Sequence, residues 1–276
     1  MPELPEVETV KETLKVRLLG KTIKEVFSPY PKIIKMDFQE FKSKITNQTF
    51  RDINRYGKYL FFVLDDYTLV SHLRMEGKYY MRESLDQLTK HDHVVFKLGD
   101  NTFLSYHDVR KFGTMELVER GMEFTLLSVK KLGVEANQKN IDADAIFEKF
   151  QKAKRPIKSV LLDQSILTGL GNIYVDETLF RSKIHPEVLA SNLNKDDVIE
   201  ILNNAKIVLD KAIQLGGTTI RTYQSSFGVD GRFQNELNVH TMVGKPCPIC
   251  NTKIEKIKVG GRGTYFCPNC QKRKTL

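Results

Sequence analysis

The chain has 276 residues, of which 41% are apolar, and carries a formal net charge of +9. A chain of this length can bury a sizeable core and is long for one domain, so its length favours two domains. The sequence has no signal peptide and no apolar run long enough for a membrane helix. It therefore predicts a cytoplasmic protein that does not enter membranes, and its positive charge favours an anionic partner.

The first predicted element is a helix over residues 5–19. Pro5 suits a first helical position, and Gly20 ends the pattern. The apolar residues recur at helical spacing, as Val7, Val10, Leu14 and Leu18. Glu3 and Glu6 would point inward with this stripe if the helical turn extends backward. Capping of the helix explains these acids without any chemistry, whereas burial would require a functional reason, and both interpretations stay open.

Strands are expected next, in two short-looped hairpins rich in aromatic and β-branched residues. Residues 59–64 and 68–73 flank Asp65-Asp66-Tyr67, and residues 93–98 and 102–107 flank Gly99-Asp100-Asn101. A β-rich domain therefore follows the first helix. We interpret His91-Asp92-His93 as part of a strand, where two alternating histidines without further ligands are a poor metal site.

From about residue 125 the apolar pattern becomes helical. Helices are expected over residues 126–132, 141–150, 157–162, 173–180 and 196–215, with a domain boundary near Gly133. The Gly169-Leu170-Gly171 loop precedes one of these helices, where free backbone N–H groups can bind an anion. Lys154, Arg155 and Lys158 lie just upstream and favour a phosphate site, although a plain turn between helices is the alternative.

All four cysteines lie near the C-terminal end, as Cys247-Pro-Ile-Cys250 and Cys267-Pro-Asn-Cys270. Two such pairs at this separation predict one structural Zn²⁺ held by four thiolates, with a hairpin between the pairs. Two disulfides and a redox Cys-x2-Cys are the alternatives, but disulfides do not suit a reducing compartment and no thioredoxin-like context surrounds either cysteine pair.

The same end of the chain is strongly basic. Residues 245–276 carry a net charge of +7, which leaves +2 for the rest of the chain. Gly260-Gly261-Arg262-Gly263 is expected at the hairpin tip, where Arg262 offers a planar guanidinium to a phosphate. An exposed arginine on a glycine turn is the simpler interpretation.

Several motifs, in order along nearly the whole chain, resemble bacterial formamidopyrimidine-DNA glycosylases. They are Pro2-Glu3-Leu4-Pro5-Glu6-Val7-Glu8, Gly57-Lys58-Tyr59-Leu60, His72-Leu73-Arg74-Met75, Lys90-His91-Asp92-His93, Asp108-Val109-Arg110-Lys111-Phe112-Gly113, Gly169-Leu170-Gly171-Asn172 and the four-cysteine finger. The resemblance implies an α+β protein with three parts. These are an N-terminal helix plus β-sandwich domain (1–132), a helical domain with a helix-two-turn-helix motif (133–237) and a zinc finger (238–276).

The resemblance also implies a base-excision enzyme that removes oxidised purines, such as 8-oxoguanine and formamidopyrimidines, from duplex DNA and then cleaves the strand. After removal of the initiator Met, the Pro2 amine would attack C1′ of the damaged nucleoside. Glu3 would donate a proton to the opening sugar, with Glu6 in a supporting position. Lys58 and Arg262 would serve as proton donors for elimination at the 3′ and 5′ phosphates. Without the resemblance, Lys58 would be interpreted as an exposed cation.

Glycosylases rotate their target nucleotide out of the helix. The resemblance assigns Met75, Arg110 and Phe112 to the space left behind, with Arg110 facing the orphaned base. It assigns contacts with the DNA backbone to His72, His91, Lys154 and Asn172. Residues 216–228 resemble the loop that closes over the flipped base.

Two departures from the family pattern stand out. His240-Thr241-Met242 replaces the usual Tyr-Gly-basic run before the finger. The base-closing loop varies within the family, so its residues Gln224 to Phe227 do not determine which oxidised purine is preferred. The related endonuclease VIII branch, which prefers oxidised pyrimidines, is one alternative, although Leu4 and the Arg110–Phe112 pair argue against it. A DNA-binding module without catalysis is another alternative. We expect the protein to act as a monomer.

Overall fold

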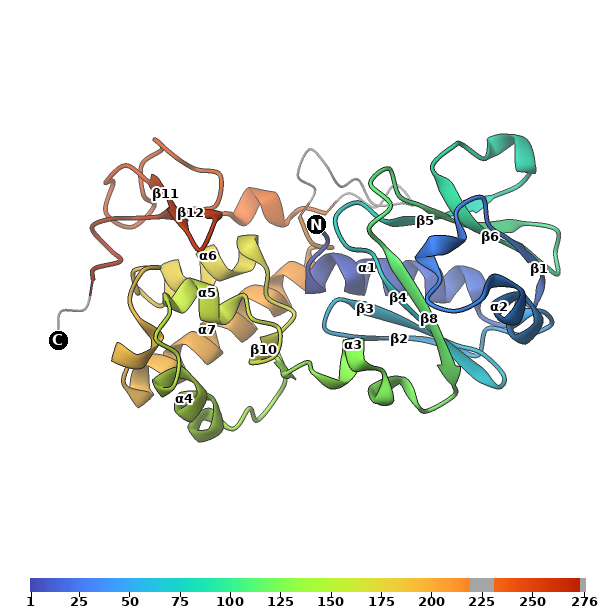
Figure 1. Cartoon of the computed structure of the whole chain (residues 1–276). Helices are drawn as coiled ribbons and strands as arrows, with labels where there is room; N and C mark the ends of the chain where they lie inside the picture. The colour runs from blue at the N-terminus through green and yellow to red at the C-terminus, as the bar shows by residue number, and fades with distance from the viewer. Residues whose placement is uncertain (219–230, 274–276) are drawn as a thin grey trace. The chain divides into compact units, whose positions relative to one another are not determined.

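The computed structural model describes residues 1–218 and 231–273, which form two compact units (Figure 1). The first contains Met1–Lys131 together with Thr218 and Gly231, and the second contains Leu132–Gly217 and the chain from Arg232 onward. The predicted α+β class is confirmed. Among the described residues no helix has the length and apolar character to cross a membrane.

The first unit begins with the predicted helix, α1 (Leu4–Leu18). Its apolar stripe is buried, with exposed fractions of 2% or less for Val7, Val10, Leu14 and Leu18. The helix lies along the sheet that contains β2 and β3 (Figure 1). A second helix, α2 (Phe38–Ile45), is capped by Asp37, whose carboxylate accepts hydrogen bonds from the N–H groups of Gln39 and Glu40.

Two antiparallel four-stranded sheets form the rest of this unit. One has the order β2 (Asp52–Tyr56), β3 (Tyr59–Val63), β4 (Tyr67–His72) and β8 (Thr114–Glu119). The other has the order β1 (Ile23–Phe27), β6 (Asp92–Leu98), β7 (Phe103–His107) and β5 (Lys78–Arg82). Both predicted hairpins are confirmed, and they lie in different sheets.

Aromatic rings from the two sheets pack against each other. The Tyr79 ring on β5 lies 5.1 Å from that of Phe62 on β3 and 5.2 Å from that of Tyr106 on β7, between ring centroids. The Tyr79 hydroxyl also donates to Ser71 Oγ on β4 at 2.7 Å. Because all these side chains are buried, the two sheets enclose a common core, which confirms the predicted sandwich.

The second unit is built around four helices, α4 (Ala143–Gln151), α5 (Ile157–Leu161), α6 (Asn172–Arg181) and α7 (Lys195–Gln214). A short parallel pair, β9 (Val134–Glu135) and β10 (Leu167–Thr168), lies beside them. The predicted helix over residues 126–132 is only the single turn α3 (Leu127–Lys130), because the chain becomes extended at β9. Short 3-10 turns occur at Pro31–Ile33, Leu85–Gln87, Glu123–Thr125, Ala190–Asn192 and Phe233–Glu236.

The C-terminal hairpin consists of β11 (Glu255–Val259) and β12 (Arg262–Phe266), as predicted. Gly260 and Gly261 form its turn with φ of +53° and +79°, a conformation that favours glycine. Arg262 is the first residue of β12, where it pairs with Val259, so it lies just beyond the turn.

Burial of α1 should contribute strongly to the stability of the first unit. We expect Leu14→Ala to lower the free energy of unfolding by about 2–5 kcal/mol, since it leaves a cavity under a fully buried side chain. Val16→Ala is the control on the same helix, because Val16 is 87% exposed, and its effect should stay within about 0.5 kcal/mol. Urea denaturation measures the unfolding free energy of both variants, and equal losses would contradict the burial of Leu14 on α1.

Candidate functional site

The start of the chain is buried. Pro2 and Glu3 precede or cap α1, and the side chains of Glu3 and Glu6 are only 3% and 5% exposed. One oxygen of the Glu6 carboxylate accepts the Glu3 backbone N–H at 2.8 Å. The other accepts the backbone N–H and the hydroxyl of Thr218 at 2.8 and 2.9 Å. Glu6 therefore fixes the residues next to Pro2 and connects them to Thr218, so capping alone does not account for this acid.

Lys58 lies in the turn between β2 and β3, next to Gly57, whose φ is +57°. The Arg55 guanidinium bonds to the Glu8 carboxylate on α1 at 2.6 Å and to the Gly57 carbonyl at 2.9 Å. This bridge holds the turn against the first helix. Lys58 is only 4% exposed, so the interpretation of this residue as an exposed cation is wrong.

His72 ends β4 opposite Tyr59, and their rings meet edge to face with centroids 4.4 Å apart. Burial, together with the positive charges of Arg74 and Lys58, lowers the pKa of His72 from 6.5 to about 3. Its Nδ1 accepts the Arg74 backbone N–H at 2.9 Å, which suits a neutral imidazole. His72 thus holds the turn that leads to Met75, and its predicted contact with DNA stays a prediction.

The three residues assigned to the opened base pair lie on two loops. Met75 is half-buried between β4 and β5, whereas Arg110 and Phe112 are exposed between β7 and β8. The Arg110 guanidinium lies over the Phe112 ring, 4.8 Å from its centroid. Because Phe112 is 52% exposed, this pair presents an apolar surface and a cation to solvent.

The histidines on either side of Asp92 do not converge on one point. His93 is buried and its Nε2 contacts the Asp108 carbonyl at 2.8 Å, whereas His91 is half-buried beside the His107 ring. Within residues 1–218 and 231–273, the cysteine cluster alone has the geometry of a metal site. His91 remains a candidate for DNA contact.

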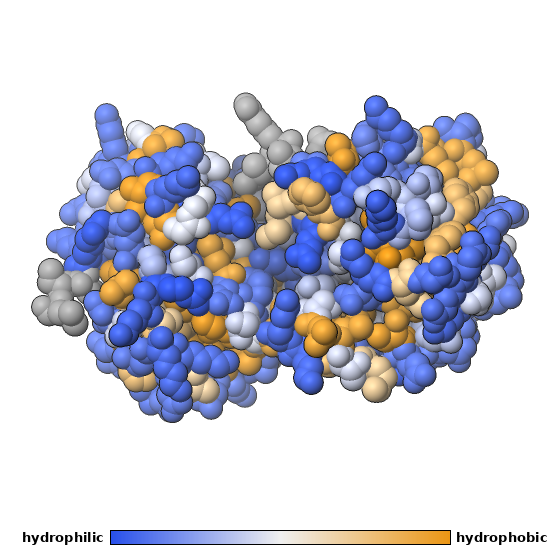
Figure 2. Space-filling view, viewed as in Figure 1, coloured by the Kyte–Doolittle hydropathy of each residue, from blue (hydrophilic) through white to orange (hydrophobic). Residues whose placement is uncertain are grey.

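In the second unit, Lys154 lies at a basic cavity of about 500 Å³. The lining residues that carry charge are Lys149, Lys152, Lys154, Arg155 and Asp163. Arg155 pairs with Asp163 at 2.9 Å, while Lys154 is exposed. Hydrophilic residues are widespread on the visible surface of this unit (Figure 2). The cavity can accept an anion, consistent with the predicted phosphate contact of Lys154.

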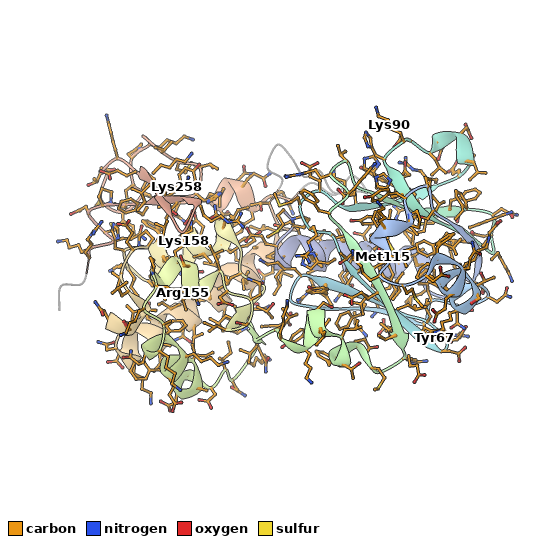
Figure 3. All side chains as sticks on the ribbon, viewed as in Figure 1. Tyr67, Lys90, Met115, Arg155, Lys158 and Lys258 are labelled. Carbon is orange, nitrogen blue, oxygen red and sulfur yellow. The ribbon has the colours of Figure 1, made fainter. Side chains whose placement is uncertain are left out.

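Lys158, by contrast, is not available to phosphates, contrary to the prediction. It lies on α5 (Figure 3) and is completely buried. Its ammonium pairs with the Asp176 carboxylate at 2.7 Å and donates to the Gly263 carbonyl at 3.1 Å. Asn172 Nδ2 donates to the same carbonyl at 3.0 Å. These two donors hold the hairpin next to Arg262.

The departure at His240 also has a structural role. His240 Nδ1 contacts the second oxygen of Asp176 at 2.8 Å, and its ring packs edge to face on Tyr265 of β12. The Tyr265 backbone N–H donates to that oxygen at 3.3 Å. His240 therefore attaches the approach to the finger to α6 and the hairpin.

The four cysteine sulfurs lie within 4.8 Å of one another, and two of these Sγ–Sγ pairs are 3.5 and 3.8 Å apart. Four thiolates in this arrangement fit one tetrahedral zinc ion whose coordination is complete, so the metal is structural. Zinc would connect the two knuckles that flank the hairpin.

Sequence reasoning missed three residues that organise these sites: Asp108, Asp176 and Thr218. Asp108 lies within a quoted motif without an assigned role, and Asp176 lies among apolar residues of α6, where a buried acid is unusual. The latter pattern was a usable signal. Thr218 lies in the segment predicted to close over the flipped base, but no pattern indicated its contact with Glu6, which joins distant parts of the chain. Residues 219–228 of the predicted closing loop, including Gln224 to Phe227, lie outside the described residues.

Three family models match the chain. They are the formamidopyrimidine-DNA glycosylase N-terminal domain over residues 1–115, the H2TH domain of the same family over residues 132–224, and the zinc finger found in FPG and IleRS over residues 244–273. Together they span both structural units and the cysteine cluster.

Individual proteins with this name are similar over the full length. The formamidopyrimidine-DNA glycosylase of Oceanobacillus iheyensis is 50% identical over 276 residues, covering 99% of each chain. That of Lactobacillus helveticus is 47% identical over 272 residues, covering 98% of this chain and 99% of the relative.

Solved structures agree with these similarities. A Lactococcus lactis FPG mutant in complex with Fapy-dG containing DNA has a TM-score of 0.93 and 43% identity, covering 99% of this chain and 100% of that one. MutM in complex with carbocyclic 8-oxo-G containing DNA has a TM-score of 0.91 and 42% identity over the same shares.

The low pKa of His72 predicts a pH-dependent stability. The unfolded state takes up a proton below about pH 6.5 and the folded state only near pH 3, so the stability contributed by His72 is complete above pH 6.5 and is lost as the pH falls. Gln can accept the same N–H and does not titrate, so we compare the wild type with His72→Gln. As the pH falls from 6.5 to 3, the unfolding free energy of the wild type should fall relative to that of His72→Gln by up to about 1.4 kcal/mol per pH unit. A difference independent of pH would contradict a neutral, buried His72.

Zinc content should follow the cysteine cluster. We expect Cys267→Ser to reduce bound zinc well below one ion per chain and to expose the hairpin amides to hydrogen exchange. Ile249→Ser is the control, since Ile249 lies inside the first knuckle and is 62% exposed. Atomic absorption measures the metal, and retention of zinc by Cys267→Ser would contradict a four-thiolate site.

Proposed function

This chain belongs to the formamidopyrimidine-DNA glycosylase family, and we propose that it excises oxidised purines from duplex DNA and cleaves the strand at the resulting abasic site. The observation that carries the proposal is the buried N-terminal segment, in which Pro2 and Glu3 are held next to Glu6. Its relatives are named DNA glycosylases. The lyase activity of the same family is one that the chemistry of an N-terminal proline permits.

Pro2 is proposed as the nucleophile once Met1 has been removed. An α-amino group has a pKa near 8, so on the order of a tenth of it is neutral at pH 7. Its nitrogen bonds to C1′ while the bond from C1′ to the damaged base breaks, and the base leaves with a proton. Glu3 donates a proton to the sugar ring oxygen as the ring opens, which gives an iminium at Pro2.

The iminium is an electron sink that acidifies C2′, and loss of that proton expels the 3′ phosphate. Lys58 is proposed to donate a proton in this first elimination. Its burial beside His72, whose pKa it lowers, supports a functional position rather than a solvated one. Arg262 is assigned to the second elimination, at the 5′ phosphate. Because arginine stays charged, its physical contribution is to hold the phosphate.

Duplex DNA is the proposed partner. The solved structures similar to this chain include complexes with Fapy-dG and 8-oxo-G containing DNA. Met75, Arg110 and Phe112 are proposed to occupy the gap left by the flipped nucleotide, which the exposure of Arg110 and Phe112 supports. The proposed contacts with the DNA backbone are His72, His91, Lys154 and Asn172. Zinc is not part of the reaction and holds the hairpin that bears Arg262.

Both alternatives are less well supported. Named relatives at 47–50% identity are formamidopyrimidine-DNA glycosylases, which disfavours the pyrimidine-specific branch. A noncatalytic module would not require the buried acids at the N-terminus. We further propose three domains, over residues 1–132, 133–237 and 238–276. We also propose that the protein is a monomer that acts in the cytoplasm, where reduced thiolates can hold zinc.

Borohydride trapping tests the proposal directly. With a duplex that carries 8-oxoguanine opposite cytosine, protein lacking Met1 should form a covalent adduct localised to Pro2 by mass spectrometry, because borohydride reduces the iminium. A chain extended by one residue before Pro2 is the control, since its proline nitrogen is an amide and should not react. Binding without adduct or cleavage across a panel of lesions would refute the enzymatic function.

A further inference from the structure

The two loops that carry Met75 and the Arg110–Phe112 pair cross between the same two sheets. One joins β4 to β5 and the other joins β7 to β8. At one end of the loops His72 pairs with Thr114, and at the other Lys78 pairs with His107. Both pairs of strand ends are therefore hydrogen-bonded, so the loops emerge side by side from one edge of the sandwich.

Asp108 organises the second loop from inside. It is completely buried, and its Oδ1 accepts the Arg110 backbone N–H at 3.0 Å. Its Oδ2 accepts the backbone N–H groups of Phe112 and Gly113, both at 2.9 Å. Three donors on one carboxylate fix the path of the loop, including Lys111, whose φ of +57° is uncommon for a residue with a side chain.

Tyr106 connects this loop to the other one. Its hydroxyl lies 3.4 Å from Asp108 Oδ2. A Cβ placed on Gly113 would lie 1.6 Å from that hydroxyl oxygen, and one placed on Gly77 would lie 2.2 Å from it. The hydroxyl thus fills the space between the glycines that end the two loops, and no larger residue fits at either position without a rearrangement.

We propose that Asp108 and Tyr106 are positioning residues that hold Met75, Arg110 and Phe112 as one preformed wedge. The inference rests on the proposed function, because it assumes that these three side chains occupy the space of a flipped nucleotide. A wedge that is ordered before DNA binds avoids the cost of ordering two loops when the base pair opens. Asp108 and Tyr106 act through the loops and do not touch the DNA.

The test compares two substrates whose cleavage depends to different extents on the wedge, because only one of them has a base to extrude. Extrusion of 8-oxoguanine breaks a base pair and unstacks a base, whereas an abasic site has no base to extrude. In Asp108→Asn, an amide NH₂ replaces one acceptor and faces backbone donors. We expect the single-turnover excision rate opposite cytosine to fall about tenfold or more, as for lost charge-assisted hydrogen bonds. Cleavage of the same duplex with a preformed abasic site should change less than about threefold.

Glu123→Gln is the matched control. Glu123 is a buried carboxylate of the same unit that accepts the Gly121 backbone N–H at 3.1 Å and the Thr68 hydroxyl, but its loop carries none of the proposed DNA contacts. Both rates should stay close to those of the wild type. The control separates a loss of wedge geometry from the general cost of neutralising a buried acid.

The ratio of the two rates decides the inference. Equal losses on both substrates, or no loss on 8-oxoguanine, would overturn it. If Asp108→Asn does not fold, as judged by circular dichroism, Tyr106→Phe decides by the same ratio, since it keeps the ring and removes only the hydroxyl. If the wild type neither excises the base nor forms the borohydride adduct, the proposed function fails, independently of the wedge.

Discussion

Buried carboxylates that accept backbone N–H groups hold the loops of this protein in place. Glu6 accepts the backbone N–H groups of Glu3, which follows Pro2, and of Thr218. Asp108 accepts three N–H groups from the Arg110–Phe112 loop and the glycine after it. Glu177 accepts the N–H groups of residues 238–240. Loop N–H groups have no partner in a helix or sheet, so burying them requires an acceptor, and a carboxylate offers two oxygens that are charged. Each acid satisfies several donors at once and fixes the backbone around them.

This arrangement explains how loops without regular structure can be functional sites. The chemistry proposed for Pro2 would require a chain terminus that stays in one place, which a terminus rarely does by itself. The bonds from Glu6 to Glu3 and Thr218 supply that restraint. In the second unit, Asp176 has a comparable role, because it holds Lys158 and His240 against the hairpin.

The finger requires a different solution because it is small. Its buried cluster contains few apolar residues, namely Phe180, Val239, Cys247, Ile254 and Cys267. So small a core cannot stabilise a hairpin alone, and a metal held by four thiolates replaces the missing apolar burial. The contacts of the Gly263 carbonyl with Lys158 and Asn172 then connect the hairpin to the helices.

Local patterns in the sequence were sufficient to predict α1 and the main helices of the second unit, the two apolar hairpins and the zinc ligands, since each depends on residues close together in the chain, whereas α2 was not predicted. The flanking strands β1, β2, β5 and β8 were not predicted. Each of them carries two charged side chains in five or six residues, so only their pairing with β3, β4, β6 and β7 makes them strands. Lys158 was misinterpreted as a surface cation because its partner Asp176 is 18 residues away.

The sequence by itself therefore determined the family resemblance, the metal site and the identity of the candidate reactive groups, all of which follow from residue type and spacing. Tertiary structure alone decided which charges are buried and what they hold. Lys58 is buried because Arg55 connects its turn to Glu8 on α1, and Tyr106 joins the ends of two loops because its hydroxyl fills the space between Gly77 and Gly113. These roles depend on contacts between distant segments, and no local pattern encodes such contacts.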